Sequence, residues 1–129
     1  MILADTSIWI DHFRTSNPKM ESLLNRGRIA MHPCVVAEIA LGSLSNRRLK
    51  LAAMDSLRRV KVAQLSEVRR MIEAHSLYSK GIGLTDTQLI ASCLITPGTQ
   101  LWTRDAAMMK VASGFRILVN PKMLRKPLP

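Results

Sequence analysis

The first thirteen residues, MILADTSIWIDHF, constrain the fold more than any other stretch of the chain. A short apolar run, Ile2–Ala4, ends at Asp5, and two hydroxyl residues and a second apolar run follow. This order is typical of a central strand of an α/β domain, with a helix leaving the strand through a polar turn. In open parallel sheets the chemistry collects beyond the carboxyl ends of the strands, so we expect Asp5 in the active crevice. An aspartate before a helix is also a common N-cap, which is the simpler interpretation of this stretch alone.

Short apolar segments alternate with helix-forming segments through the rest of the chain. This alternation predicts an α/β class with a short parallel sheet. The 129 residues contain no linker or repeat, and this length suits one domain. We therefore expect a single domain over 1–129, with its core in about 1–119 and a basic, Pro-rich tail over 120–129. Strands are expected at 2–4, 28–31, 101–103 and 116–119, and helices up to 15 and over about 18–26, 33–41, 66–75, 89–95 and 106–113.

The charge balance indicates a polyanionic partner. Nineteen Lys and Arg face nine Asp and Glu, which gives a formal net charge of +10. A charge of this size usually marks a nucleic-acid partner, with an acidic protein second and an anionic membrane surface third. Aromatic residues make up only 4% of the chain, which argues against a platform on which single-stranded bases stack.

The sequence predicts a soluble, cytoplasmic protein without a membrane anchor. No apolar run approaches the roughly 18 residues of a membrane span. The N-terminus has an acid within its first apolar stretch and lacks the basic region of a signal peptide. Cys34 and Cys93 each lie in an apolar run outside any CxxC spacing, which is typical of reduced, buried thiols.

Four acids form the candidate site: Asp5, Glu38, Asp86 and Asp105. A helix cap explains three of them separately, and Asp86 lies in Thr85–Gln88, which matches a capping box. Asp5 and Asp105 both follow short apolar strands, however, so we expect both at one edge of a parallel sheet. Glu38 stands in the middle of the most apolar helix, so it is either turned to a rim or buried, and burying it unpaired would be costly.

Converging acids need a counter-charge. Two carboxylates about 4 Å apart repel by roughly 4 kcal/mol at an effective dielectric near 20. Four of them require a proton, a basic neighbour or a metal ion, and oxygen ligands favour Mg²⁺ or Mn²⁺. Such ions activate water and neutralise charge in phosphodiester hydrolysis. A basic surface around an acidic metal pocket is therefore the profile of a nuclease.

Four segments carry a family resemblance, in the order DTSIWIDHF, VVAEIALG, LTDTQLIASCL and LWTRDAAMMKVA. Together they resemble the PIN domain, and more narrowly the VapC toxins of bacterial toxin–antitoxin pairs, from about Met1 to Val119. The resemblance implies an α/β/α sandwich around a short central parallel sheet. It also implies a metal-dependent endoribonuclease that forms a homodimer. A VapB-like antitoxin would hold this enzyme inactive by covering the active site with its C-terminal segment.

The same resemblance implies roles for individual residues. The four candidate acids match the metal-binding and catalytic positions, with Mg²⁺ or Mn²⁺ as the cofactor. Three hydroxyl residues match positions that line the pocket and orient ligands or water: Thr6, Ser7 and Thr103.

Basic residues are the candidate contacts for RNA phosphates. Arg104 directly precedes Asp105, and a basic, amphipathic segment runs from Arg47 to Lys61. A solvated helix face explains these bases equally well. The candidates are Arg104, Arg47, Arg48, Lys50, Arg58 and Arg59.

Two further residues are expected to be structural. His75 lies on the apolar stripe of its helix and is predicted to be packed there rather than to act as a ligand. Asp11 lies one or two turns along its helix and is also predicted to be structural.

Two other functions compete with the ribonuclease. The first is a non-catalytic RNA-binding domain of the same fold, in which the acids are only helix caps; the complete set of four acids argues against it. The second is a phosphohydrolase of the haloacid dehalogenase kind, which also begins with a strand that ends in Asp. That chemistry needs a second Asp two places later, where this chain has Ser7.

Overall fold

Four short parallel strands form the centre of the protein, whose computed structural model describes residues 1–124. The strands are β1 (Ile2–Ala4), β2 (Ile29–Met31), β3 (Arg58–Arg59) and β4 (Gln100–Trp102), in the spatial order β3-β2-β1-β4. Leu3 of β1 lies opposite Ala30 on one side and opposite Leu101 on the other. The strand order thus reverses beside β1, which in α/β sheets is where a crevice opens at the carboxyl edge.

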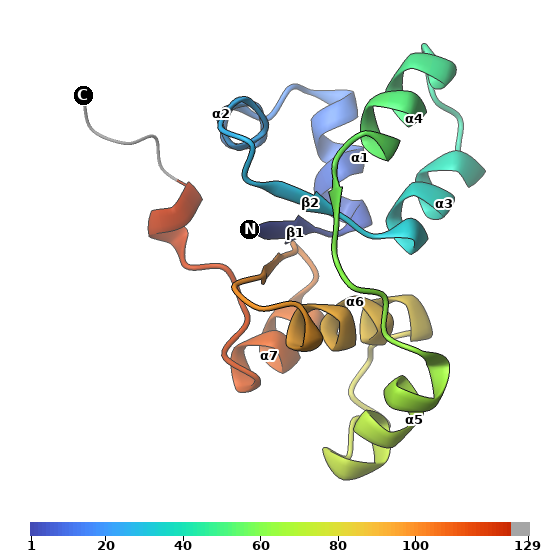
Figure 1. Cartoon of the computed structure of the whole chain (residues 1–129), viewed down its shortest axis with the longest axis vertical. Coiled ribbons are helices and arrows are strands. Elements are labelled where there is room, and N and C mark those ends of the chain that lie inside the picture. The colour runs from blue at the N-terminus through green and yellow to red at the C-terminus, as the bar shows by residue number, and fades with distance from the viewer. Residues whose placement is uncertain (125–129) are drawn as a thin grey trace.

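Helices cover both faces of this sheet (Figure 1). One layer contains α1 (Thr6–Arg14), α2 (Pro18–Asn25), α3 (Pro33–Leu41) and α4 (Arg47–Asp55). The other layer contains α5 (Leu65–Ala74), α6 (Leu84–Ile95) and α7 (Ala106–Gly114). The α/β class and the α/β/α sandwich expected from the sequence are therefore confirmed.

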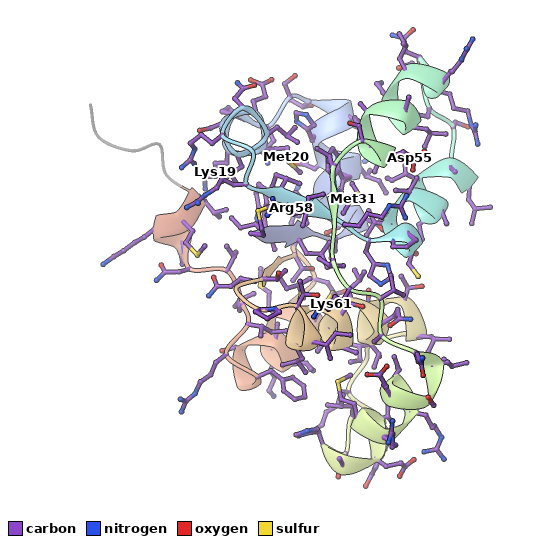
Figure 2. All side chains as sticks on the ribbon, viewed as in Figure 1. Lys19, Met20, Met31, Asp55, Arg58 and Lys61 are labelled. Atoms are coloured by element: carbon purple, nitrogen blue, oxygen red, sulfur yellow. The ribbon has the colours of Figure 1, made fainter. Side chains whose placement is uncertain are left out.

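The core lies on both faces of the strands. Leu3, Met31 and Leu101, one from each of three adjacent strands, are fully buried. Strands that are buried on both faces are typical of parallel sheets covered by helices. Figure 2 shows Met20 of α2 and Met31 within the molecule, whereas the charged side chains of Lys19 and Lys61 lie at its surface.

A buried polar bridge connects the end of β2 to α6. The Cys34 N–H donates to Nδ1 of His32, so Nε2 of the neutral ring carries the proton and donates to Ser92 Oγ at 3.1 Å. The Ala63 N–H also donates to Ser92 Oγ, at 3.1 Å. Burial, followed by the positive charge of Arg59, lowers the pKa of His32 to about 4, which keeps the ring neutral at pH 7.

The sheet differs from the expected one at both edges. Residues 116–119 make only an isolated bridge, in which Leu118 pairs with Leu101. Arg116 has a φ of 60°, because the chain turns sharply after α7. Conversely, β3 was not expected, since its two exposed arginines carry no apolar strand pattern. Charged residues are common on such edge strands.

One sequence expectation about local structure is wrong. The capping box at Thr85–Gln88 does not form, because α6 begins earlier and has Gly83 as its N-cap. In the expected tail, Pro121–Leu124 form a 3₁₀ turn against α2 that buries Leu124. Residues 125–129 of the tail lie outside the described part of the chain.

Within residues 1–124, no helix is both long and apolar enough to cross a membrane.

Ser92→Ala tests the buried polar bridge. The change leaves the His32 ring and the Ala63 N–H without a buried partner, so the free energy of unfolding should fall by about 1–3 kcal/mol. Urea unfolding measures the loss. Ser113→Ala on the exposed side of α7 is the matched control and should change stability by no more than about 0.5 kcal/mol. Equal stability of the two variants would contradict the role given to Ser92.

Candidate active site

Asp5 lies at the carboxyl end of β1 and links that strand to its neighbour β4. Its N–H donates to the Trp102 carbonyl at 2.9 Å. Its carboxylate is 5% exposed, caps α1 by accepting from the Ile8 N–H at 3.2 Å, and also accepts from Ser7 and Thr103. Asp5 is therefore a helix cap whose buried carboxylate is fixed by donors from the first turn of α1 and from the end of β4.

The three hydroxyl residues singled out from the sequence all hold the acids in place. Ser7 Oγ donates to Asp5 Oδ1 at 2.5 Å, and Thr103 Oγ1 donates to Asp5 Oδ2. Thr103 Oγ1 also accepts from the N–H of Asp105 at 3.1 Å. Thr6 Oγ1 donates to Glu38 Oε1 at 2.6 Å, which joins α1 to α3.

Asp105 and Glu38 lie on the exposed rim of the crevice. Asp105 follows β4 as expected and caps α7, since its Oδ1 accepts from the Met108 N–H at 2.8 Å. Glu38 is on the exposed side of α3, so the apolar helix buries its other face and not this acid. Among residues 1–124, one oxygen of each of these two carboxylates has no hydrogen-bond partner.

Asp86 lies in the first turn of α6 and is half-buried. Its Oδ2 accepts from the Gly83 N–H at a long 3.5 Å. Burial raises the pKa of the Asp86 carboxyl, the Gly83 N–H opposes this, and the negative charges of Asp105, Asp5 and Glu38 raise it further. Asp86 therefore experiences the charge of all three other candidate acids, which come from three other segments of the chain.

The four acids converge without forming a closed ligand cluster. Within residues 1–124, no three His, Cys, Asp or Glu side chains are grouped closely enough to hold a metal ion by themselves. This arrangement still suits Mg²⁺, which usually keeps several waters and takes one or two carboxylates from the protein. The donor set consists of carboxylate and hydroxyl oxygens, the ligands that such hard cations prefer.

The candidate bases differ in their relation to the acids. Arg104 forms an ion pair with Asp11, with 2.7 Å between its Nη1 and Oδ1 of Asp11. Lys50 lines the same cavity as Glu38. Arg59 pairs with Asp55 instead, at 3.3 Å. No contact with the four acids is recorded in the described chain for Arg47, Arg48, Arg58 or Arg59.

The expectation for His75 is wrong. Its side chain is exposed rather than packed, because α5 ends at Ala74 and His75 follows as its C-cap. Its ring stands edge-on to the ring of Phe115, with centroids 4.8 Å apart. Asp11 is tied to Arg104 across 93 residues of sequence, a contact for which the local sequence holds no signal.

Comparison with known proteins places this site in a family. The PIN domain family matches residues 2–114, nearly the whole described chain. The chain belongs to the PIN domain family. It is similar to Ribonuclease VapC32 from two strains of Mycobacterium tuberculosis, CDC 1551 / Oshkosh and ATCC 25618 / H37Rv. Each is 37% identical over 105 residues, which cover 81% of this chain and 85% of the relative. The matched region of this PIN domain contains all four acids.

Asp86→Asn tests the electrostatic convergence of the acids. Because the pKa of Asp86 is raised in the folded state, its ionisation destabilises that state at neutral pH, and the amide removes this cost. We expect a gain in unfolding free energy below about 1 kcal/mol, since solvent screens the repulsion. The gain should fade as the pH falls toward about 4, where the unfolded carboxyl also becomes protonated.

Urea unfolding at several pH values measures this gain. Glu21→Gln, on the exposed side of α2, is the control and should show no pH-dependent gain of this kind. Loss of stability in Asp86→Asn at neutral pH would mean that its contact with Gly83 outweighs the repulsion.

Proposed function

We propose that this protein is an endoribonuclease that depends on Mg²⁺ or Mn²⁺ and acts as the toxin of a type II toxin–antitoxin pair. The observation that carries the proposal is the gathering of the acids at the carboxyl ends of β1 and β4, where Thr103 contacts both Asp5 and Asp105. The pKa of Asp86 agrees with this, since burial and then the charges of Asp105, Asp5 and Glu38 raise it. Repulsion of this kind has no structural benefit, but it favours a divalent cation. The similarity to Ribonuclease VapC32 supports RNA as the substrate.

Asp5, Glu38, Asp86 and Asp105 are the residues that we assign to metal binding and catalysis. When bound, Mg²⁺ or Mn²⁺ would lower the pKa of a water molecule and offset charge on the scissile phosphate. Asp5 supplies a rigid carboxylate, since three hydrogen bonds fix its orientation. Glu38 and Asp105 each keep one oxygen without a partner in residues 1–124, and these oxygens would be available to hold the ion or to orient an attacking water.

The hydroxyl residues act as positioning residues in this proposal. Thr103 contacts both Asp5 and the N–H of Asp105, so a single side chain sets the spacing of two acids. Thr6 restrains Glu38, which is otherwise exposed. Groups that orient ligands in this way commonly change metal affinity or activity by about 10- to 100-fold when they are removed.

RNA binding would use the basic surface. The net charge of +10 attracts a polyanion, and Arg104 adjoins the acids directly. Asp11 holds the Arg104 guanidinium at the rim of the site, where an RNA phosphate could replace the carboxylate as its partner. Arg47, Arg48, Lys50, Arg58 and Arg59 are further proposed contacts, of which Lys50 shares a cavity with Glu38.

A protein partner is also part of the proposal. A cavity of about 400 Å³ lies between α1, α3 and α4, is lined by Ile10 and Phe13, and includes Glu38. A VapB-like antitoxin segment in this cavity would cover one of the four acids. Leu41 and Leu49 are 88% and 74% exposed nearby, which supports a protein contact on this side. We also propose a homodimer and a cytoplasmic location for the toxin.

Asp5→Asn and Asp86→Asn test the catalytic assignment. Each should reduce metal-dependent RNA cleavage by at least about 100-fold, because each removes a charged ligand while keeping the side-chain shape. Cleavage is measured on purified protein with Mg²⁺ or Mn²⁺, and circular dichroism checks the fold. Glu21→Gln removes one negative charge on α2 and should cleave like the unaltered protein.

The same assay separates the proposal from a non-catalytic RNA-binding domain. That domain would bind RNA but show no metal-dependent cleavage in the unaltered protein. Cleavage that persists in both acid variants, with contaminating nuclease excluded, would contradict the catalytic assignment.

A further inference from the structure

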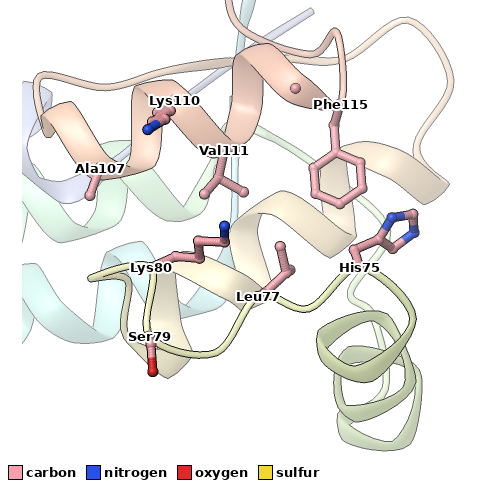
Figure 3. Close-up of a pocket in the computed structure, with 9 residues that line it drawn as sticks. His75, Leu77, Ser79, Lys80, Ala107, Lys110, Val111 and Phe115 are labelled. Atoms are coloured by element: carbon pink, nitrogen blue, oxygen red, sulfur yellow. The ribbon is translucent and has the colours of Figure 1, made fainter.

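A second cavity, of about 650 Å³, lies between α7 and the loop that follows α5 (Figure 3). Its volume lies within the range of about 300–1,000 Å³ that is common for small-molecule sites. None of the four candidate acids lines it. Its lining includes His75, Leu77, Lys80, Lys110, Val111 and Phe115.

The two walls of this cavity belong to the segments that present Asp86 and Asp105. Lys80 lies three residues before Gly83, whose N–H contacts Asp86. On the other wall, Ala107 is two residues after Asp105. A Cβ placed on Gly81 would lie 3.5 Å from Cβ of Ala107, so loop and helix are in contact at this end. The cavity therefore begins beside the acids and continues along α7.

The charge of the cavity is positive. It is lined by Lys80 and Lys110 and by no Asp or Glu of the described chain. Neither lysine takes part in an ion pair within residues 1–124. In Figure 3 the Lys80 side chain extends from the loop toward α7, which carries Lys110. Two unpaired ammonium groups on facing walls suit a phosphate.

The remaining surface is apolar and aromatic. The His75 and Phe115 rings meet edge-to-face, at an interplanar angle of 71°. Leu77 and Val111 lie beside them (Figure 3). Flat apolar surface next to cationic groups is the combination with which proteins hold a single-stranded nucleotide, since the base stacks or packs while the phosphate pairs.

The loop has a defined shape. Ser76, Ser79 and Gly81 have positive φ values of 51°, 59° and 82°, which place sharp turns in the loop. The loop is anchored by Leu77, which is 8% exposed and whose N–H donates to the Ile72 carbonyl at 3.0 Å. The cavity is therefore formed before any ligand arrives, which reduces the entropic cost of binding.

We propose that this cavity binds one nucleotide of the RNA strand adjacent to the cleavage position. Its phosphate pairs with Lys80 and Lys110, and its base packs against Phe115 and His75. The cavity thereby sets the register of the strand on the acids and contributes to the choice of cleavage site. This inference rests on the proposed ribonuclease function, because it takes RNA as the substrate.

A protein segment is the competing occupant. Three observations favour a nucleotide: two lysines without ion-pair partners in residues 1–124, a lining without acids of the described chain, and the contact with the acid-bearing segments. If the cavity instead held part of a second copy of this chain, its residues would be needed for the two copies to associate. They would not be needed for RNA affinity.

The double variant Lys80→Gln/Lys110→Gln tests the proposal. Affinity for a fluorescent single-stranded RNA is measured by anisotropy in EDTA, so that cleavage does not enter. Loss of two phosphate contacts should weaken binding about tenfold near physiological salt. It should also reduce the slope of log affinity against log salt by about 1.4.

The matched control is Lys19→Gln/Lys122→Gln, which removes the same charge from exposed positions on α2 and the 3₁₀ turn. It should change affinity by less than about twofold. Equal effects of the two double variants would overturn the proposal, because the lysines would then act only through net charge. A change in sedimentation mass in the cavity variant without loss of RNA affinity would overturn it in favour of a contact between copies.

Amide NMR shifts on titration with uridine 5′-monophosphate give a second readout. Shifts concentrated in 75–81 and 107–115 support the nucleotide site, and shifts confined to other segments contradict it. Failure of the ribonuclease proposal is a separate result, namely absence of metal-dependent cleavage by the unaltered protein. The binding measurements decide the cavity's role in either case.

Discussion

The carboxylate of Asp5 ties the carboxyl ends of two parallel strands together. It accepts hydrogen bonds from Ser7, in the first turn of α1, and from Thr103, directly after β4, while its backbone N–H donates to the Trp102 carbonyl. Thr103 in turn contacts Asp105, so the spacing of two acids depends on this buried connection. The same contacts that cap α1 therefore also build the crevice. Fold and candidate chemistry share one set of hydrogen bonds.

The free-energy cost of bringing the four acids together is concentrated at Asp86. Burial and three negative neighbours raise its pKa, and the Gly83 N–H only partly compensates. Natural proteins tolerate such local destabilisation where function requires it. The basic residues elsewhere in the chain do not directly offset the negative charge around Asp86, because Arg104 is paired with Asp11 and Arg59 with Asp55. A divalent cation is the counter-charge that suits the site.

Strong local patterns in the sequence predict most of the fold and the places of Asp5 and Asp105 in it. Apolar runs that end in Asp5 and Asp105 indicated two adjacent strand ends, and both residues lie there. β3 was missed because two exposed arginines have no apolar pattern. The prediction that His75 is packed on its helix is wrong, because an apolar stripe does not reveal that the helix ends at Ala74. Contacts between residues far apart in the sequence leave no local pattern from which to predict them. The hydrogen bond between His32 and Ser92 and the cavity beside α7 are examples.

The central claim is that Asp5, Glu38, Asp86 and Asp105 surround one site for a divalent cation. Paramagnetic Mn²⁺ tests it most directly, because the ion broadens amide signals according to their distance from it. Titration into ¹⁵N-labelled protein should first broaden the amides around Asp5, Gly83–Asp86 and Thr103–Asp105, which come from three separate segments. Broadening spread evenly over the exposed acids, or absent from any one of these three segments, would contradict a shared metal site.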